Sequence, residues 1–225
     1  MKITNVKGSY HEGITMWSDP LINVKDDIIT QDEADYIINL AKSNMMDATV
    51  LGDSGKPKLA TDIRSASLCW LDYDNDVIKE IGERISRYVG IPLNNAEQMQ
   101  VIHYEVGEKY NAHHDAFDMS TTSGQKACMY GGQRLVTALV YLNKVPKGGD
   151  TQFPNLGITV HTQLGRMVVF NNTDTDIRRP IHDSVHAALP VEAGEKWAIN
   201  IWFRMLPRNE KFSLPYKSLP KVKFI

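Results

Sequence analysis

The stretch from Tyr104 to Phe117, YEVGEKYNAHHDAF, decides how the rest of this sequence is interpreted. In it His113 and Asp115 stand two residues apart. On a β-strand this spacing directs both side chains to the same face. An H-x-D pattern alone is weak evidence for a metal site in a chain with seven histidines, so the sequence around it has to support that interpretation.

The downstream sequence supports a metal site. His186 is followed by Lys196, which lies in a strand-like apolar run that ends at Trp202. Two imidazoles and one carboxylate on one side of a metal leave open positions, the arrangement of non-haem Fe(II) oxygenases. A cation deep in an apolar strand is costly unless it is paired. Lys196 therefore predicts an anionic partner, which a dicarboxylate co-substrate would supply.

Size and composition fit one large globular domain, or a domain with a helical extension. The chain has 225 residues, of which 42% are hydrophobic and 23% charged. The net charge of -2 gives no general attraction to nucleic acid or membranes.

Cys69 and Cys128 lack the spacing of a metal site or a redox pair and are expected to be reduced thiols. No secretory leader or membrane-length apolar run is recognised, so a cytoplasmic location is expected.

Two helices are predicted in the first half. Thr30 and Glu33 form a capping box, and Ala34, Ile37, Ile38 and Ala41 follow at helical spacing. A second helix is predicted from about Asn75 to Val89, ended by Gly90 and Pro92. Each helix has one apolar face, so both are expected to cover a sheet. Residues 1–26 are interpreted as one or two strands on the outside of that sheet.

Beyond Pro92 the apolar period changes to two. The segments MQVIHYEV, RLVTALVYL, ITVHTQLGRMVVF and Lys196 to Arg204 are separated by Gly, Pro and Asn, which favours antiparallel strands. The predicted fold is α+β, mainly β: a double-stranded β-helix, or jelly roll, with supporting N-terminal helices. The single domain 1–225 would comprise a helical support over 28–92, a jelly-roll core over 96–204 and a C-terminal strap over 205–225.

The connection between Phe117 and Arg134, DMSTTSGQKACMYGGQ, is long and rich in Ser, Thr and Gly. It directly follows the proposed metal ligands, so a mobile lid is one interpretation. An exposed hairpin loop is the other. The sequence leaves both open.

Four motifs in order carry a family resemblance. They are Tyr104-x-x-Gly107-x-x-Tyr110-x-x-His113-x-Asp115; Arg134-x-x-Thr137 with Tyr141-Leu142-Asn143; Gly148-Gly149-Asp150-Thr151-x-Phe153-Pro154; and His186 with Pro190, Val191, Gly194, Lys196 and Trp197. With these motifs the chain, from about Ile28 to Arg204, resembles the prolyl 4-hydroxylase branch of the Fe(II)- and 2-oxoglutarate-dependent oxygenases.

The resemblance implies roles for particular residues. It implies that the catalytic metal ligands for Fe(II) are His113, Asp115 and His186. It also implies that Lys196 pairs with the distal carboxylate of 2-oxoglutarate, with Tyr104 and Thr151 as hydrogen-bonding partners. The substrate cleft would be lined by Tyr110, Arg134 and Trp202. The implied co-substrates are 2-oxoglutarate and O2, and the family adds ascorbate to the expected cofactors.

The implied reaction is 4-hydroxylation of prolyl residues in a peptide or protein, with release of succinate and CO2. The same chemistry on a free amino acid, another side chain or a nucleic-acid base is the first alternative, and a non-catalytic jelly-roll binding module is the second. The near-neutral charge favours a peptide over nucleic acid. The retained ligand set argues against a non-catalytic module.

Some positions depart from the family pattern without removing a ligand. Asp150 stands where Glu is usual, His161 where Pro is common, and Ala188-Leu189 replace a Gly-Cys pair. Among the other histidines, His182 is a second candidate for the distal ligand, but His186 has the right spacing to Lys196. His114 and His103 are expected to point away from the site.

Overall fold

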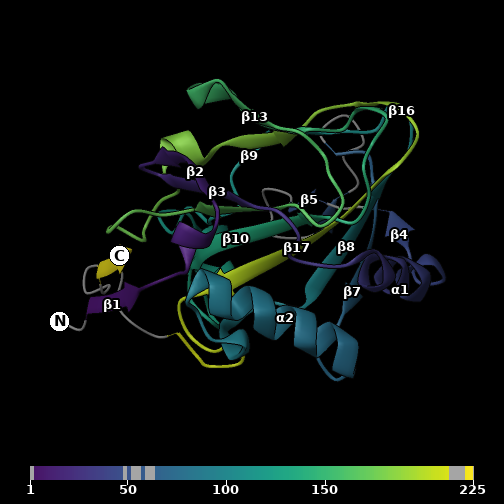
Figure 1. The fold of residues 1–225 in the computed structure, drawn as a ribbon. Helices are drawn as coiled ribbons and strands as arrows, with labels where there is room; N and C mark the ends of the chain where they lie inside the picture. Colours follow the sequence, from purple (N-terminus) through teal and green to yellow (C-terminus); the bar gives the residue numbers. More distant parts are fainter. Residues whose placement is uncertain (1–2, 48–49, 52–56, 59–63, 213–220, 225) are drawn as a thin grey trace.

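A computed structural model describes residues 3–47, 50–51, 57–58, 64–212 and 221–224. Two β-sheets face each other, and the helices cover the outer face of the larger one (Figure 1). This is the predicted jelly roll with supporting helices. The division into support, core and strap stays a prediction.

The larger sheet has eight strands. In spatial order they are β2 (Ile14–Ser18), β3 (Leu21–Lys25), β14 (Met167–Asn171), β10 (Arg134–Tyr141), β17 (Lys196–Arg204), β8 (Met99–Tyr104), β7 (Ser67–Leu71) and β4 (Met46–Asp47). All neighbours in it are antiparallel. The central strands β10 and β17 carry the apolar alternation that the sequence predicts, and both are almost fully buried.

The smaller sheet has four strands, in the order β13 (Ile158–Val160), β12 (Thr151–Phe153), β15 (His186–Ala188) and β9 (Tyr110–His113). It is also antiparallel. Three short pairs complete the strands: β11 (Lys147–Gly148) with β16 (Val191–Ala193), β5 (Val50–Leu51) with β6 (Pro57–Lys58), and β1 (Ile3–Val6) with β18 (Lys221–Phe224). The β1–β18 pair is parallel.

The two long helices begin and end as their capping residues dictate. Helix α1 (Gln31–Lys42) has the capping box of Thr30 and Glu33. Helix α2 (Asp76–Val89) begins after Asn75, whose side chain accepts a hydrogen bond from the Ile78 backbone, and ends at Gly90 in the left-handed conformation. Short 3-10 turns lie at Tyr10–Glu12, Leu93–Asn95, Pro154–Leu156 and His182–Ser184.

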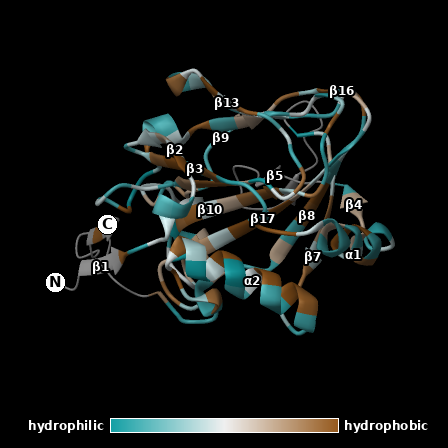
Figure 2. Ribbon diagram, viewed as in Figure 1, coloured by the Kyte–Doolittle hydropathy of each residue, from teal (hydrophilic) through white to brown (hydrophobic). Residues whose placement is uncertain are grey.

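Apolar side chains pack into cores on both faces of the larger sheet. The outer core joins α1 and α2 to the sheet and includes Ile37, Ile81 and Ile85, all fully buried. The inner core lies between the two sheets and includes Phe153 and Phe170. Figure 2 shows the hydrophilic residues of α2 on its outward side. The helices therefore support the sheet from behind, and the space between the sheets is left for the site.

The structure corrects three details of the sequence interpretation. Strand β9 ends at His113, so Asp115 lies on the bend after it rather than on the strand. The run ITVHTQLGRMVVF forms two strands, because the chain turns at Gly165 with a φ of 73°. The connection after Phe117 contains a short helix, α3 (Thr122–Ala127), capped by the Thr121 side chain.

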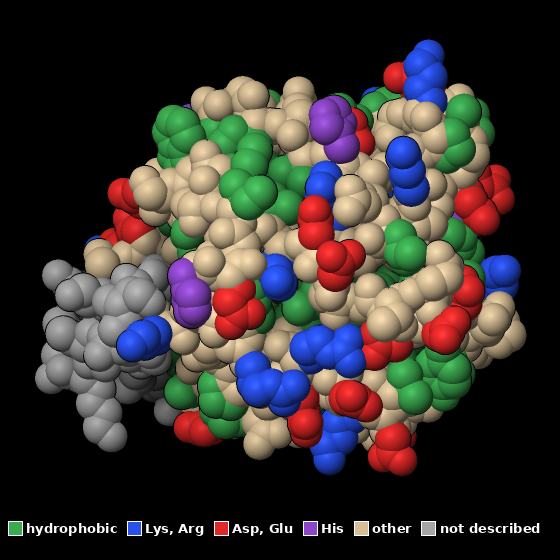
Figure 3. All heavy atoms as spheres, in the orientation of Figure 1, with side chains coloured by type: hydrophobic (Ala, Val, Ile, Leu, Met, Phe, Trp, Pro, Cys, Tyr) green, Lys and Arg blue, Asp and Glu red, His purple; other side chains and the backbone are tan. Residues whose placement is uncertain are grey.

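The remaining global features follow the composition. Cys69 and Cys128 are buried and unpaired. On the face drawn in Figure 3, acidic and basic side chains are interspersed rather than segregated, as the small net charge would suggest. Within the described residues, no helix is both long and apolar enough to cross a bilayer.

Candidate active site

The predicted metal ligands meet between the two sheets. His113 and His186 are direct partners in the β9–β15 pairing, and their rings lie 4.3 Å apart between centroids. The Asp115 carboxylate approaches the Nε2 atoms of both histidines, each at 3.6 Å. One donor atom from each of the three residues lies within 4.8 Å of the others. Two imidazoles and a carboxylate gathered in this way fit Fe(II).

Hydrogen bonds fix which nitrogen of each histidine faces the centre. The Nδ1 atom of His113 lies 2.8 Å from the Asn111 carbonyl, and that of His186 lies 3.1 Å from the Ser184 carbonyl. A carbonyl only accepts, so Nδ1 carries the proton and Nε2 keeps its lone pair for a metal. Burial lowers the pKa of His186 to about 4, which keeps the imidazole neutral as a ligand must be.

The carboxylate between the histidines is held from behind. Thr137, fully buried on β10, donates from Oγ1 to Asp115 Oδ2 at 2.7 Å and accepts from Asn172 Nδ2 at 2.8 Å. Burial alone would raise the pKa of Asp115, but the two imidazoles and Arg134 outweigh it, so the pKa lies below its usual range. Thr137 stood in a quoted motif without an assigned role; the structure gives it one.

Lys196 shares a narrow cavity with the histidines. The cavity, of about 20 Å³, is lined among others by Tyr104, Thr151 and His186. The lysine is 1% exposed, and its Nζ donates to the Gly149 carbonyl at 2.5 Å. No carboxylate of the described residues pairs with this ammonium, and burial lowers its pKa to about 7. The Asp150 carboxylate offsets part of this burial but forms no ion pair with Lys196. The buried cation therefore fits an anionic ligand, which would displace the Gly149 contact.

The two polar partners predicted for a co-substrate lie beside Lys196. Thr151 Oγ1 accepts a hydrogen bond from the Tyr141 hydroxyl at 2.8 Å. The ring of Tyr104 lies 5.3 Å from the Lys196 Nζ, and burial raises the pKa of its phenol to about 12, so the hydroxyl stays protonated. Both hydroxyls remain able to hydrogen-bond to a carboxylate.

The predicted substrate residues line a more open cleft of about 450 Å³ on the other side of the metal ligands. Tyr110 stacks on the His113 ring at 3.5 Å, and the Arg134 guanidinium lies 3.9 Å above the Trp202 ring. Arg134 is fixed by a two-pronged pair with Glu97, at 2.6 and 2.7 Å. Sequence reasoning missed Glu97, whose contact with a strand 37 residues away has no local signal.

The other histidines lie outside the ligand set. His182 is exposed on its 3-10 turn and bonds Asn155 and Asp183. His103 stacks on Trp197 and pairs with Glu195. His114 reaches Ser184 Oγ at 3.4 Å but also lines the substrate cleft, so the expectation that it points away from the site is wrong. None of the three belongs to the cluster of possible metal donors among the described residues.

The two departures at Asp150 and His161 touch each other. His161 Nδ1 lies 2.8 Å from Asp150 Oδ2, and the other carboxylate oxygen accepts from the Thr162 backbone at 3.0 Å. The shorter acid and the unusual histidine therefore form a pair beside the Lys196 cavity.

Comparisons with known proteins agree with this geometry. Residues 99–204 match the model of the 2OG-Fe(II) oxygenase superfamily. A putative prolyl 4-hydroxylase of Acanthamoeba polyphaga mimivirus is 34% identical over 190 residues, covering 84% of this chain and 75% of the relative. Probable prolyl 4-hydroxylase 10 of Arabidopsis thaliana is 32% identical over 213 residues, covering 85% and 71%.

Solved structures give the same fold. A viral collagen prolyl hydroxylase from Paramecium Bursaria Chlorella virus-1, in complex with 2-oxoglutarate, superposes with a TM-score of 0.62 at 26% identity, covering 81% of this chain and 95% of the other. A prolyl hydroxylase from Trichoplax adhaerens, bound to a peptide fragment of hypoxia inducible factor, has a TM-score of 0.58 at 16% identity, covering 81% and 83%. The second likeness concerns the fold alone.

Proposed function

Since this chain belongs to the 2OG-Fe(II) oxygenase superfamily, in its prolyl 4-hydroxylase branch, we propose that it 4-hydroxylates prolyl residues of a peptide or protein substrate. The observation that carries the proposal is that Lys196 is buried, forms no ion pair with a carboxylate of the described residues, and lines the same cavity as His186. A metal centre next to an unpaired cation fits a keto acid bound by its two ends. The substrate is then left for the open cleft.

Each group of residues has a place in the proposed reaction. His113, Asp115 and His186 would hold Fe(II), which with 2-oxoglutarate and O2 supplies the oxidising chemistry that hydroxylates an unactivated carbon and releases succinate and CO2. The Lys196 ammonium would turn from the Gly149 carbonyl to the distal carboxylate, and Tyr104 and Thr151 would hydrogen-bond to it. These contacts fix the co-substrate relative to the metal ligands.

The cleft residues would orient the substrate. Tyr110 and Trp202 offer aromatic faces beside the metal ligands, and Arg134 offers hydrogen-bond donors that Glu97 holds in place. Aromatic side chains suit the apolar ring of proline. Ascorbate as a further cofactor belongs to this proposal, and the dependence of sustained turnover on added ascorbate tests it.

The experiment is 2-oxoglutarate turnover by the Fe(II)-loaded protein under controlled oxygen, with and without proline-rich peptides, followed by mass spectrometry. We expect succinate formation coupled to the gain of one oxygen atom on proline. Peptides with alanine in place of proline and the Asp115→Ala variant are the controls. Coupled turnover with a free amino acid or a nucleic-acid base, and none with any prolyl peptide, would contradict the proposed substrate.

A further inference from the structure

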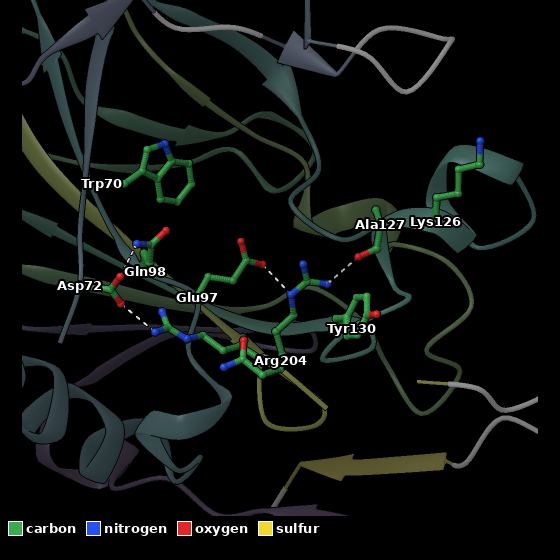
Figure 4. Close-up of a pocket in the computed structure, with 10 residues that line it drawn as sticks. Trp70, Asp72, Glu97, Gln98, Lys126, Ala127, Tyr130 and Arg204 are labelled. Carbon is green, nitrogen blue, oxygen red and sulfur yellow. Dashed lines mark hydrogen bonds and ion pairs between the residues drawn. The ribbon is translucent and has the colours of Figure 1, made fainter. Parts of the chain in front are cut away.

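The substrate cleft adjoins a second hollow of about 640 Å³. Trp70, Ala127 and Arg204 line both the cleft and this hollow, so the two spaces are neighbours. In Figure 4, Trp70, Asp72 and Gln98 lie on one side of the hollow and Ala127, Tyr130 and Lys126 on the other. The ion pair of Glu97 with Arg204 lies between the two sides.

The hollow carries an excess of positive charge. Its lining residues include the cations Lys126, Arg204 and Arg208 and the carboxylates Asp72 and Glu97, and Glu97 pairs with Arg204 at 2.7 Å. Asp72 is already satisfied by Arg208 and Gln98, at 2.7 and 2.6 Å. At the rim, exposed Lys126 pairs with no carboxylate of the described residues. This local excess is opposite in sign to the net charge of the chain.

Arg204 keeps one donor free. Its Nε pairs with Glu97, and its Nη1 donates to the carbonyls of Ala127 and Gly132. Its Nη2 makes no hydrogen bond within the described part of the chain, although the side chain is only 12% exposed. This Nη2 is not one of the fully buried unsatisfied atoms, so it is open to a ligand as well as to water. A carboxylate is the strongest partner for such a guanidinium donor.

Aromatic surface connects the hollow to the metal side of the cleft. The Trp70 and Trp202 rings lie 6.0 Å apart, and Trp70 is 37% exposed. Tyr130, on the opposite side, is 54% exposed. Aromatic-lined grooves bind extended, proline-containing peptides because such peptides lose little conformational entropy on binding.

From this combination we infer that the hollow is a second subsite, which binds the substrate segment on one side of the target residue and selects an acidic side chain there. The carboxylate of that side chain contacts the free Nη2 of Arg204, and Lys126 adds charge at the rim. The inference rests on the proposed function in one respect: the substrate has to be a peptide that extends beyond the cleft.

The test uses fluorescently labelled peptides that each contain a single proline. The peptides are made in pairs that differ only by Glu or Gln at one position. Successive pairs place this residue at different distances before and after the proline. Binding to the full-length protein is measured by anisotropy at low and high salt. We expect the Glu peptides to bind about two- to fivefold more tightly than the Gln peptides, on one side of the proline only. The difference should shrink as salt is added.

Lys126→Glu is the variant, and Lys42→Glu is its matched control. Both lysines are exposed and stand in the last turn of a helix, so both variants lose a favourable interaction with a helix end. Lys42 lies on α1, on the outer face of the sheet. We expect Lys126→Glu to weaken the preference for Glu peptides, because it replaces the positive charge at the rim by a negative one, and Lys42→Glu to leave the preference unchanged.

Equal binding of Glu and Gln peptides at every position would overturn the inference. A preference on both sides of the proline, or one that Lys126→Glu leaves unchanged, would also overturn it. Failure to bind any peptide would overturn both the inference and the proposed function. Mass spectrometry of the same peptides separates the two. Selective binding without hydroxylation would support the subsite and contradict the proposed prolyl substrate. Hydroxylation without selectivity would support the prolyl substrate and contradict the subsite.

Discussion

The Thr137 hydroxyl is the contact that fixes the Asp115 carboxylate. Thr137→Val keeps the side-chain shape but removes the donor to Asp115 and the acceptor for Asn172. We expect the affinity for Fe(II) to fall by about 10- to 100-fold, the usual effect of losing such a supporting hydrogen bond. Anaerobic metal titration measures it.

Thr137→Ser is the control, because it retains the hydroxyl and should bind metal nearly as the parent does. If Thr137→Val bound Fe(II) with undiminished affinity, the hydrogen bond to Asp115 would have no part in holding the ligand.

Lys196 makes the binding of 2-oxoglutarate depend on pH. Its pKa is about 7 in the free protein because of burial, and a bound carboxylate would raise it. Below pH 7 the ammonium is already charged; above it, binding must take up a proton. We therefore expect the affinity for 2-oxoglutarate to fall by up to about tenfold per pH unit above pH 7. Calorimetry of the metal-loaded protein in buffers of different ionisation enthalpy measures the proton uptake.

Lys196→Met is the comparison, since it has no proton to gain at this position. It should bind 2-oxoglutarate weakly at every pH and with no slope from this group. A pH slope equal to that of the parent would assign the effect to another group.

At this scale the sequence predicted the residues that recur in fixed patterns. The sequence pointed to His113 and Asp115 because they stand only two residues apart. It pointed to Lys196 because this lysine lies within one predicted apolar strand. The roles of Thr137 and Glu97 could not be predicted, because each depends on contacts between segments that are far apart in the sequence and meet only in the folded chain. The pairing of His161 with Asp150 was hidden for the same reason.

Helix α2 stabilises the larger sheet through side chains such as Ile81, which is fully buried in the outer core. Ile81→Ala should lower the free energy of unfolding by about 2–5 kcal/mol, from lost burial and the cavity left behind. Urea unfolding measures this loss. The affinity for 2-oxoglutarate, measured where the protein stays folded, should not change.

The neighbouring exposed residue provides the control. Glu80 has a side chain that is 73% exposed and only a 3.7 Å contact with Arg84. Glu80→Ala should change stability by no more than about 0.5 kcal/mol. Equal losses in the two variants would mean that α2 contributes little packing energy at Ile81.

Elements with strong local signals were predictable, and those set by their neighbours were not. The start of α1 and both ends of α2 followed from capping residues and a C-terminal glycine. Helix α3 was missed because a helix of six residues is too short to show an apolar period. The end of β9 at His113 depends on its pairing with β15, which the sequence does not reveal.

The whole chain is expected to unfold as one unit, in line with the predicted single domain. The long helices dominate far-ultraviolet circular dichroism, whereas all four tryptophans lie on strands of the larger sheet: Trp17, Trp70, Trp197 and Trp202. Because one core joins helices and sheet, both signals should change at the same urea concentration. Two separated midpoints would mean that the helical support unfolds independently.

Strand β9 lies at the edge of the smaller sheet, and its last residue is one of the three that would hold the metal. A bound ion would therefore tie this edge to β15 as well as serve catalysis. Binding to the native state alone adds about 2.7 kcal/mol of stability when the free metal is at 100 times its dissociation constant. Iron supply would then set how long the protein survives proteolysis as well as how fast it works, and a starved cell would lose the enzyme along with its activity.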